Sequence, residues 1–376
     1  MTRVGPAGVL FDDFSYASST DPYLGMMGWR VVDGLSGPPS NAQYSRSLVS
    51  FAPDSTDPSN RLMLLQATTQ NTLSSMRLSR IETAMRFLEG TYAARVFFEN
   101  SARTYRDGNV QTFYLINNHP PGNLDYAEAD FEYLPYDVWN PPTYSTGMWM
   151  TTWETAPAAR SARTADLCQE NSYRTTCLIP EDHSGWHTLL IQVDGGAGVL
   201  RYFIDGTLVT TAGGQFYTET LMNISFSNWV IDGLGSPGSS TSTRTYSIMA
   251  DWVFHAQDVM LTPTEIEALV AAYRSTGIIR QDTTGGQPQP ASGLGAVASG
   301  SNRVNLSWQD NASNETGFKI ERKTTGTWSQ IATTGANLTS YQDTSLIAGT
   351  TYWYRVRAYN EQGDSIYSNE AQATTP

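Results

Sequence analysis

Three acidic residues in the segment YAEADFEYLP have the spacing of a catalytic carboxylate row. Glu128, Asp130 and Glu132 alternate with apolar or aromatic residues. Alternate side chains of a β-strand point to the same face, so all three carboxylates are expected to project together. Acidic residues are unfavourable in strands, and like charges on one face repel, so stability does not explain the row. The pattern therefore indicates a chemical function.

Glycoside hydrolysis is the chemistry that this spacing suits. The Cα atoms of Glu128 and Glu132 are expected about 13 Å apart, from a rise of about 3.3 Å per residue. On a concave sheet their tips can approach the roughly 5–5.5 Å separation of a retaining mechanism. One carboxylate then attacks the anomeric carbon, while the other protonates the leaving oxygen and later activates water. Asp130 between them helps to separate the two pKa values.

Two other interpretations compete with catalysis. The row is also compatible with a solvent-facing strand that is merely acidic, but the flanking aromatics and the lack of a matching basic row disfavour this. A calcium site is the second alternative, because acidic clusters bind hard cations. Calcium loops usually carry Gly and Asn turns between their ligands, and this strand has none. Catalysis is the favoured hypothesis.

The elements around the row are short strands separated by turn signals. Residues 1–260 contain alternating, aromatic-rich segments such as TYAARVFFE, TFYLIN and VLRYFIDGTLV, with a hairpin signal at Asp205-Gly206. This pattern predicts an all-β fold, a β-sandwich of the jelly-roll type. One helix is expected before Gly277, where Thr262, Pro263 and Glu265 form a capping signal.

A Gly-, Pro- and Gln-rich segment divides the chain. We expect domains at 1–277 and 292–376, joined by a linker at 278–291. Residues 292–376 resemble a fibronectin type III domain, a smaller immunoglobulin-like sandwich. The resemblance rests on residues at core positions of that fold, namely Trp308, Leu346, Gly349-Thr350, Tyr352, Tyr354, Val356 and Ala358. A tyrosine corner is expected in this module, which we interpret as a spacer.

The acidic segment resembles the E-x-D-x-E signature of glycoside hydrolase family 16, whose members are retaining enzymes with a concanavalin-like jelly roll. Further segments agree in order: FDDF, SRIETAMRFLEGTYAARV and TFYLINN before the signature, and GWHTLLIQVDGGAGVLRYFIDGTLV, MNISFSNW and ADWVFH after it. Together they span nearly all of residues 10–260. The ordered set is far more specific than any one fragment.

The resemblance implies a role for each matching residue. It makes Glu128 the nucleophile, Asp130 the assisting carboxylate and Glu132 the general acid/base. It also implies substrate-binding residues, namely Arg80 of the R-I-x-T segment, Tyr126 where members often place Trp, and the pair Asn228 and Trp229. A structural calcium ion bound by Asp251 is a further family feature, and no other cofactor is expected.

Aromatic residues after the acidic strand are further substrate-binding candidates. Tyr136, Trp139, Trp149 and Trp153 lie within eighteen residues, and at least one is expected to stack on a sugar ring. Trp139 and Trp153 are the two we assign to substrate binding.

Charge and composition limit the classes of molecule that the protein is expected to bind. A net charge of −13 and a pI near 4.7 leave no basic stripe for nucleic acid and disfavour acidic polymers. No apolar run approaches a membrane span. Cys168 and Cys177 are expected to form a disulfide in a secreted protein, although no signal peptide is visible. We therefore expect a secreted monomer that acts on a neutral polysaccharide.

The expected activity is that of an endo-β-glucanase on β-1,3-1,4- or β-1,3-glucan. Only Phe131 separates Asp130 from Glu132, as in mixed-linkage β-glucanases of the family, while the SRIET and SNW segments resemble laminarinases. Alternatives are a transglycosylase or a galactan hydrolase of the same family. A different class of alternative is a non-catalytic carbohydrate-binding lectin.

Overall fold

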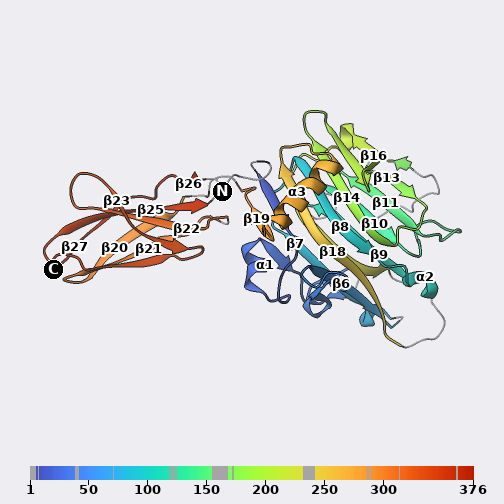
Figure 1. Cartoon of the computed structure of the whole chain (residues 1–376), viewed down its shortest axis with the longest axis horizontal. Helices are drawn as coiled ribbons and strands as arrows, with labels where there is room; N and C mark the ends of the chain where they lie inside the picture. The colour runs from blue at the N-terminus through green and yellow to red at the C-terminus, as the bar shows by residue number, and fades with distance from the viewer. Residues whose placement is uncertain are drawn as a thin grey trace. The chain divides into compact units, whose positions relative to one another are not determined.

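The chain forms two compact units, Met1–Asp282 and Thr283–Pro376. The computed structural model describes residues 6, 8–38, 42–70, 72–117, 119, 123, 125–154, 168–171, 173–231, 242–285, 288, 290–312, 314–360 and 363–376. Strands dominate both units, as Figure 1 shows. Among the described helices, none has the length and apolar character needed to cross a membrane.

The first unit contains two sheets packed face to face. We call the first the pocket sheet. It is antiparallel throughout, with neighbouring strands in the order β2 (Trp29–Val31), β7 (Arg77–Thr83), β17 (Asn223–Ile231), β9 (Gly108–Ile116), β10 (Glu128–Leu134), β11 (Gly147–Trp153), β13 (Arg174–Ile179) and β12 (Cys168–Glu170).

The second sheet, which we call the back sheet, has the long strand β18 near its middle. Its order is β16 (Thr207–Gly213), β15 (Val199–Ile204), β14 (Gly185–Asp194), β8 (Gly90–Phe98), β18 (Arg244–Gln257), β6 (Arg61–Thr69) and β5 (Val49–Pro53). Strand β1 (Val9–Asp12) pairs with the second half of β18, and β19 (Arg280–Asp282) pairs with β1.

Short elements complete the first unit. Strand β4 (Ala42–Tyr44) pairs with β3 (Ser36–Gly37) and runs parallel to β7. Strand β7 also pairs with β6 of the back sheet, so it connects the two sheets. The helices are α1 (Pro22–Met26), α2 (Ala102–Tyr105), α3 (Pro263–Ser275) and the 3-10 turns η1 (Arg46–Leu48), η2 (Leu73–Ser75) and η3 (Gly214–Phe216). Strand β19 falls inside the segment whose composition predicts a linker, and a salt bridge from Arg86 to Asp282 holds it.

The hydrophobic core lies between the two sheets, as expected for a sandwich. Strand β10 contributes Ala129, Phe131 and Tyr133 to this core, and all three are fully buried. The opposite side chains of the strand are the three acids. The period-two alternation read from the sequence is therefore present, and the all-β jelly-roll prediction is confirmed.

Helix α3 covers the outer face of the back sheet (Figure 1). It begins with the predicted capping box, in which Thr262 accepts from the Glu265 amide and the Glu265 carboxylate accepts from Thr262. Its buried face includes Tyr273, whose ring stacks on Phe11 of β1 at 4.9 Å between centroids. The helix therefore braces the sheet that lies behind the pocket sheet.

The second unit is a smaller sandwich. One sheet has the order β20 (Ser292–Gly300), β21 (Arg303–Gln309) and β24 (Ser340–Thr344), and the other has β23 (Ser329–Gly335), β22 (Gly317–Lys323), β25 (Thr351–Asn360) and β26 (Gly363–Asp364), with β27 (Ala371–Thr374) on β25. Trp308 and Tyr354 are buried in its core. The Tyr352 hydroxyl accepts a hydrogen bond from the Ile347 amide at 2.9 Å, which is the geometry of a tyrosine corner.

Candidate active site

The three acids lie side by side in a pocket on the outer face of the pocket sheet. Glu128, Asp130 and Glu132 all line this pocket, whose volume is about 200 Å³. Four other residues predicted from the sequence line it as well, namely Arg80, Tyr126, Trp153 and Trp229. The remaining lining residues are Pro38, Tyr44, Thr112, Tyr114, Ile116 and Ser227.

The strand register fixes what flanks each acid. Strands β9 and β11 lie on either side of β10, so each carboxylate has one cross-strand neighbour from each. The triplets across β9, β10 and β11 are Ile116–Glu128–Trp153, Tyr114–Asp130–Thr151 and Thr112–Glu132–Trp149. The acidic row therefore has aromatic neighbours at both ends and hydroxyl-bearing residues around its middle.

Glu128 is held by a tyrosine from its own chain segment. The Tyr126 hydroxyl donates a hydrogen bond to Glu128 Oε2. Tyr126 is almost fully buried and lies two residues before the acid. The sequence predicts a sugar platform at this position, and the structure adds a direct contact to the carboxylate.

Arg80 supplies positive charge near the acids but is already paired. It forms a salt bridge to Glu82 at 2.5 Å, and its guanidinium lies 5.5 Å from the centre of the Tyr114 ring. Burial alone would lower the pKa of Arg80, but Tyr114, Glu82, Tyr44 and Glu128 nearby raise it above the usual range. Arg80 is therefore a fixed positive charge beside the pocket.

Trp153 stands opposite Glu128 and is backed by an arginine. The guanidinium of Arg174 lies 4.5 Å from the centre of the Trp153 ring, and the two residues are register partners on β13 and β11. Both side chains are largely buried. Arg174 thus fixes the plane of the indole that borders the pocket.

A cluster of aromatic residues lies beyond the Glu132 end of the row. Trp139 lies 6.1 Å from Trp229 and 6.3 Å from Trp149, measured between ring centres. Only Trp229 of these three lines the pocket described here. Trp149 is fully buried and donates to Asp137 at 2.9 Å, so it supports the sheet. Trp139 extends the aromatic surface next to Trp229, and Tyr136 stacks on Tyr144 nearby.

The prediction that Asn228 contacts substrate is wrong. Asn228 is fully buried, and its side-chain amide donates to the carbonyl oxygens of Leu65 and Tyr246, both at 3.0 Å. These carbonyls belong to β6 and β18 of the back sheet. Adjacent residues on a strand point to opposite faces, so Trp229 faces the pocket while Asn228 joins the two sheets.

The surroundings of Asp251 do not fit a calcium ion. Asp251 lies at a β-bulge of β18. Its carboxylate accepts from Arg274 at 2.7 Å and from Asn60 at 2.7 Å, with Arg95 at 3.6 Å. Calcium takes six to eight oxygen ligands, whereas guanidinium groups already neutralise this carboxylate. In the described part of the chain, no group of three or more His, Cys, Asp or Glu residues is placed to hold a metal.

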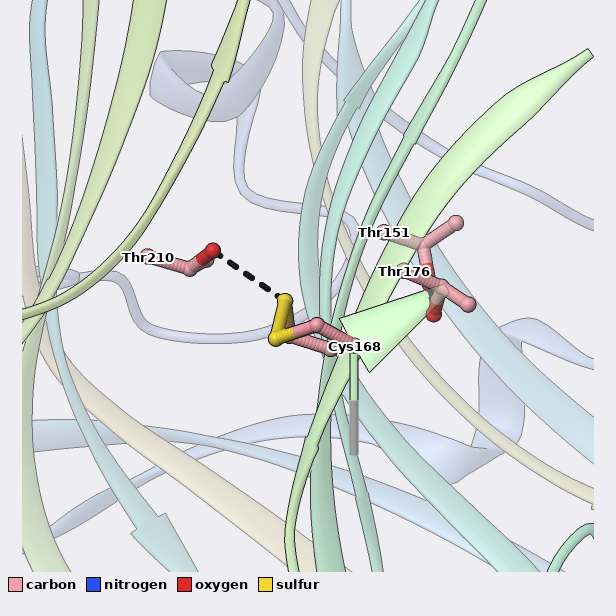
Figure 2. Close-up of a disulfide and its surroundings, with 5 residues drawn as sticks. Thr151, Cys168, Thr176 and Thr210 are labelled. Carbon is pink, nitrogen blue, oxygen red and sulfur yellow. Dashed lines mark hydrogen bonds between the residues drawn. A yellow bond between two sulfur atoms is a disulfide. The ribbon is translucent and has the colours of Figure 1, made fainter. Parts of the chain in front are cut away.

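The two cysteines form a disulfide between β12 and β13 (Figure 2). Cys168 and Cys177 are register partners on β12 and β13. The Sγ atom of Cys177 lies 3.1 Å from the hydroxyl oxygen of Thr210, which points to it from β16 of the back sheet. The bond therefore ties the last strand of the pocket sheet to its neighbour.

Several residues of the pocket were not predicted. Tyr114, Thr112 and Ile116 alternate within the segment TFYLIN, so the strand period was sufficient to place them on one face. Tyr44 and Ser227 come from distant strands, and only the fold brings them to the pocket.

Comparison with known proteins identifies the second unit. Residues 287–374 match the family model of the fibronectin type III domain, which confirms the resemblance. A comparison with curated proteins found no match.

Solved structures resemble the first unit. A β-glucanase of Bacillus licheniformis is 16% identical, with a TM-score of 0.45, over 66% of this chain and 98% of that one. A family 16 endo-glucanase of Bacteroides ovatus is 14% identical, with a TM-score of 0.48, over 65% of this chain and 98% of that one. A pseudo β-1,3-glucanase of Mycobacterium tuberculosis is 16% identical, with a TM-score of 0.45, over 67% of this chain and 99% of that one. At this level of similarity, the activity has to be inferred from the residues of the pocket.

Proposed function

We propose that the first unit is a retaining endo-glycoside hydrolase that cleaves a neutral β-glucan with β-1,3-1,4 or β-1,3 linkages. The observation that carries this proposal is the row of Glu128, Asp130 and Glu132 inside one pocket with aromatic side chains at both ends. Carboxylates supply the nucleophile and the acid, and indole faces stack on sugar rings. The resemblance to family 16 at the E-x-D-x-E segment supports the same assignment.

In the proposed first step, a Glu128 oxygen bonds to the anomeric carbon while the bond to the leaving sugar breaks. Glu132 donates its proton to the departing oxygen. In the second step, Glu132 takes a proton from water, whose oxygen bonds to the anomeric carbon as the bond to Glu128 breaks. Both enzyme groups return to their starting protonation states. Asp130 lies between them and keeps the two acids chemically distinct.

A neutral substrate is supported by the charge of the pocket and of the chain. Three carboxylates line the pocket, and Arg80, the cation among the described lining residues, is already paired with Glu82. The whole chain carries a net charge of −13. An acidic polymer would be repelled both at long range and inside the pocket.

We also propose that the protein acts outside the cell as a monomer. The disulfide between Cys168 and Cys177 supports an oxidising compartment, where such bonds persist. A polysaccharide is too large to enter a cell intact, so its cleavage outside is consistent with this location.

The test is release of reducing ends from barley β-glucan, laminarin, xyloglucan, agarose and chitosan by the full chain. We expect activity on barley β-glucan or laminarin, lost in Glu128→Gln and kept in Glu267→Gln. Glu267 is an exposed carboxylate on α3, behind the back sheet, so it controls for loss of one charge. Folded protein that binds a glucan but releases no reducing ends would support the lectin alternative and overturn the proposal.

A further inference from the structure

We propose that Tyr126 is a positioning residue that holds the carboxylate of Glu128 through its phenol hydroxyl. This inference rests on the proposed function of the pocket and gives Tyr126 a role beyond that of a sugar platform. It starts from one contact, the hydrogen bond that the Tyr126 hydroxyl donates to Glu128 Oε2. A hydrogen bond to an ionised acceptor is stronger than one between neutral groups.

The backbone around Tyr126 is fixed, so its hydroxyl is held in place. The Asn117 amide donates to the Ala127 carbonyl at 3.1 Å, directly after Tyr126. The Asn117 side chain donates to the Asp125 carbonyl, directly before it, and to Thr220 Oγ1 at 2.8 Å. Asn117 is itself buried. The residues on both sides of Tyr126 are therefore tied to the end of β9.

Tyr126 and Glu128 lie two residues apart, close enough along the chain for their side chains to meet. Residues two apart on one strand face point the same way, with Cα atoms about 6.6 Å apart. Tyr126 lies before the first residue of β10 and Glu128 is that first residue. The reach of a tyrosine side chain is enough to bridge this separation. The contact therefore needs both a tyrosine at 126 and the fixed backbone around it.

The hydroxyl acts on the charge that Glu128 gains and loses during the reaction. The carboxylate is charged in the free enzyme, loses that charge when it bonds to the anomeric carbon, and regains it when the bond breaks. A donor on Oε2 stabilises the charged form before the first step and during departure in the second. Removal of the hydroxyl should therefore favour protonation of Glu128 and slow breakdown of the covalent intermediate.

Other charged or titratable groups surround Glu128 and stay constant in the test. They come from the elements around the acid: Asp130 and Glu132 on β10, Arg80 and Glu82 on β7, Tyr44 on β4, Tyr114 on β9, Tyr202 on β15 and Arg174 on β13 behind Trp153. None of these residues is altered when only the hydroxyl of Tyr126 is removed. A change in pH dependence then reports the lost hydrogen bond.

The experiment compares wild type, Tyr126→Phe and Tyr133→Phe in the full chain. Tyr126→Phe keeps the ring and removes only the hydroxyl. Tyr133 lies on the opposite face of β10, where its hydroxyl donates to Asp182 at 3.0 Å, so it controls for the loss of a phenol–carboxylate bond outside the pocket. Thermal melts show that each variant folds. Initial rates on the active glucan are measured as a function of pH.

We expect Tyr126→Phe to lower kcat about tenfold with KM unchanged or lower, and to raise the acidic limb of the pH–rate profile by about one unit. Tyr133→Phe should match wild type. An unchanged kcat and acidic limb in Tyr126→Phe would overturn the inference, as would a raised KM alone, which indicates a sugar platform only. Inactive, folded wild-type protein would instead refute the proposed function.

Discussion

His255 gives a quantitative prediction about acid stability. It lies on β18, fully buried, with its ring stacked on Tyr92 at 4.1 Å and packed edge-on against Phe87. Burial lowers the pKa of His255 to about 3. The hydrogen bond to the Thr91 carbonyl acts in the opposite direction, and the charge of Arg86 lowers the pKa by a smaller amount. The histidine therefore stays neutral in the folded protein at a pH where the unfolded chain takes up a proton.

The sign and size of the effect follow from this difference. Above pH 6.5 both states are neutral and His255 adds no pH dependence. Between pH 6.5 and about 3, only the unfolded state binds the proton, so the free energy of unfolding falls as the pH falls. Each pH unit is worth about 1.4 kcal/mol, so the loss at pH 5 is about 2 kcal/mol.

Urea unfolding of wild type and His255→Gln at pH 7.5 and pH 5 measures how much His255 lowers the free energy of unfolding in acid. The variant loses packing at both pH values, but it lacks the titrating group. The stability advantage of wild type over the variant should therefore shrink by about 2 kcal/mol from pH 7.5 to pH 5. An advantage that stays constant across this range would contradict this prediction, because it would mean that His255 is protonated equally in both states.

Three further predictions concern Asp12, the disulfide and the ion pair at Asp251. Burial raises the pKa of Asp12 to about 7, so its contribution to stability should fall as the pH rises from about 4 to 7. In urea unfolding, Asp12→Asn should remove this fall, and a variant whose free energy of unfolding still falls as steeply over this pH range would contradict the prediction. Replacing both Cys168 and Cys177 by Ser should lower the free energy of unfolding by about 3 kcal/mol, as expected for a closed loop of this length, and a change near zero would show that the bond constrains little. Because Arg274 neutralises Asp251, EDTA should leave the melting temperature of wild type unchanged, whereas Arg274→Ala should lower it by several degrees; a large drop with EDTA would show that a metal is needed after all.

The acidic row and its orientation could be predicted because they depend only on local pattern. Glu128, Asp130 and Glu132 alternate with core residues, and a strand has only two faces. The capping box of α3 was predictable for the same reason, since Thr262 and Glu265 act on each other within one turn.

The errors come from features that depend on distant parts of the chain. Asn228 is next to a pocket residue, but on a strand its side chain points to the opposite face, where it donates to carbonyls of β6 and β18. The sequence does not show that these two strands lie there. Asp251 looks like a calcium ligand until α3 brings Arg274 to it, 23 residues further along the chain. The hydrogen-bonding partner of a polar side chain was therefore the least predictable feature of this chain.

The contact between Tyr126 and Glu128 is an intermediate case. The sequence places an aromatic residue two positions before the acid, which predicts a platform for sugar. The direction of the hydroxyl depends on how Asn117 fixes the turn before β10, and only the structure shows that.

Glu128 is proposed as the nucleophile of a retaining glycosidase. The most direct measurement uses a 2-deoxy-2-fluoro glucan oligosaccharide with an activated leaving group, which slows the second step so that the covalent intermediate accumulates. Mass spectrometry of the digested protein should then locate one glycosyl adduct on Glu128, and Glu128→Gln should show none. Release of reducing ends by wild type without any adduct, or with the adduct on another residue, would contradict this role of Glu128.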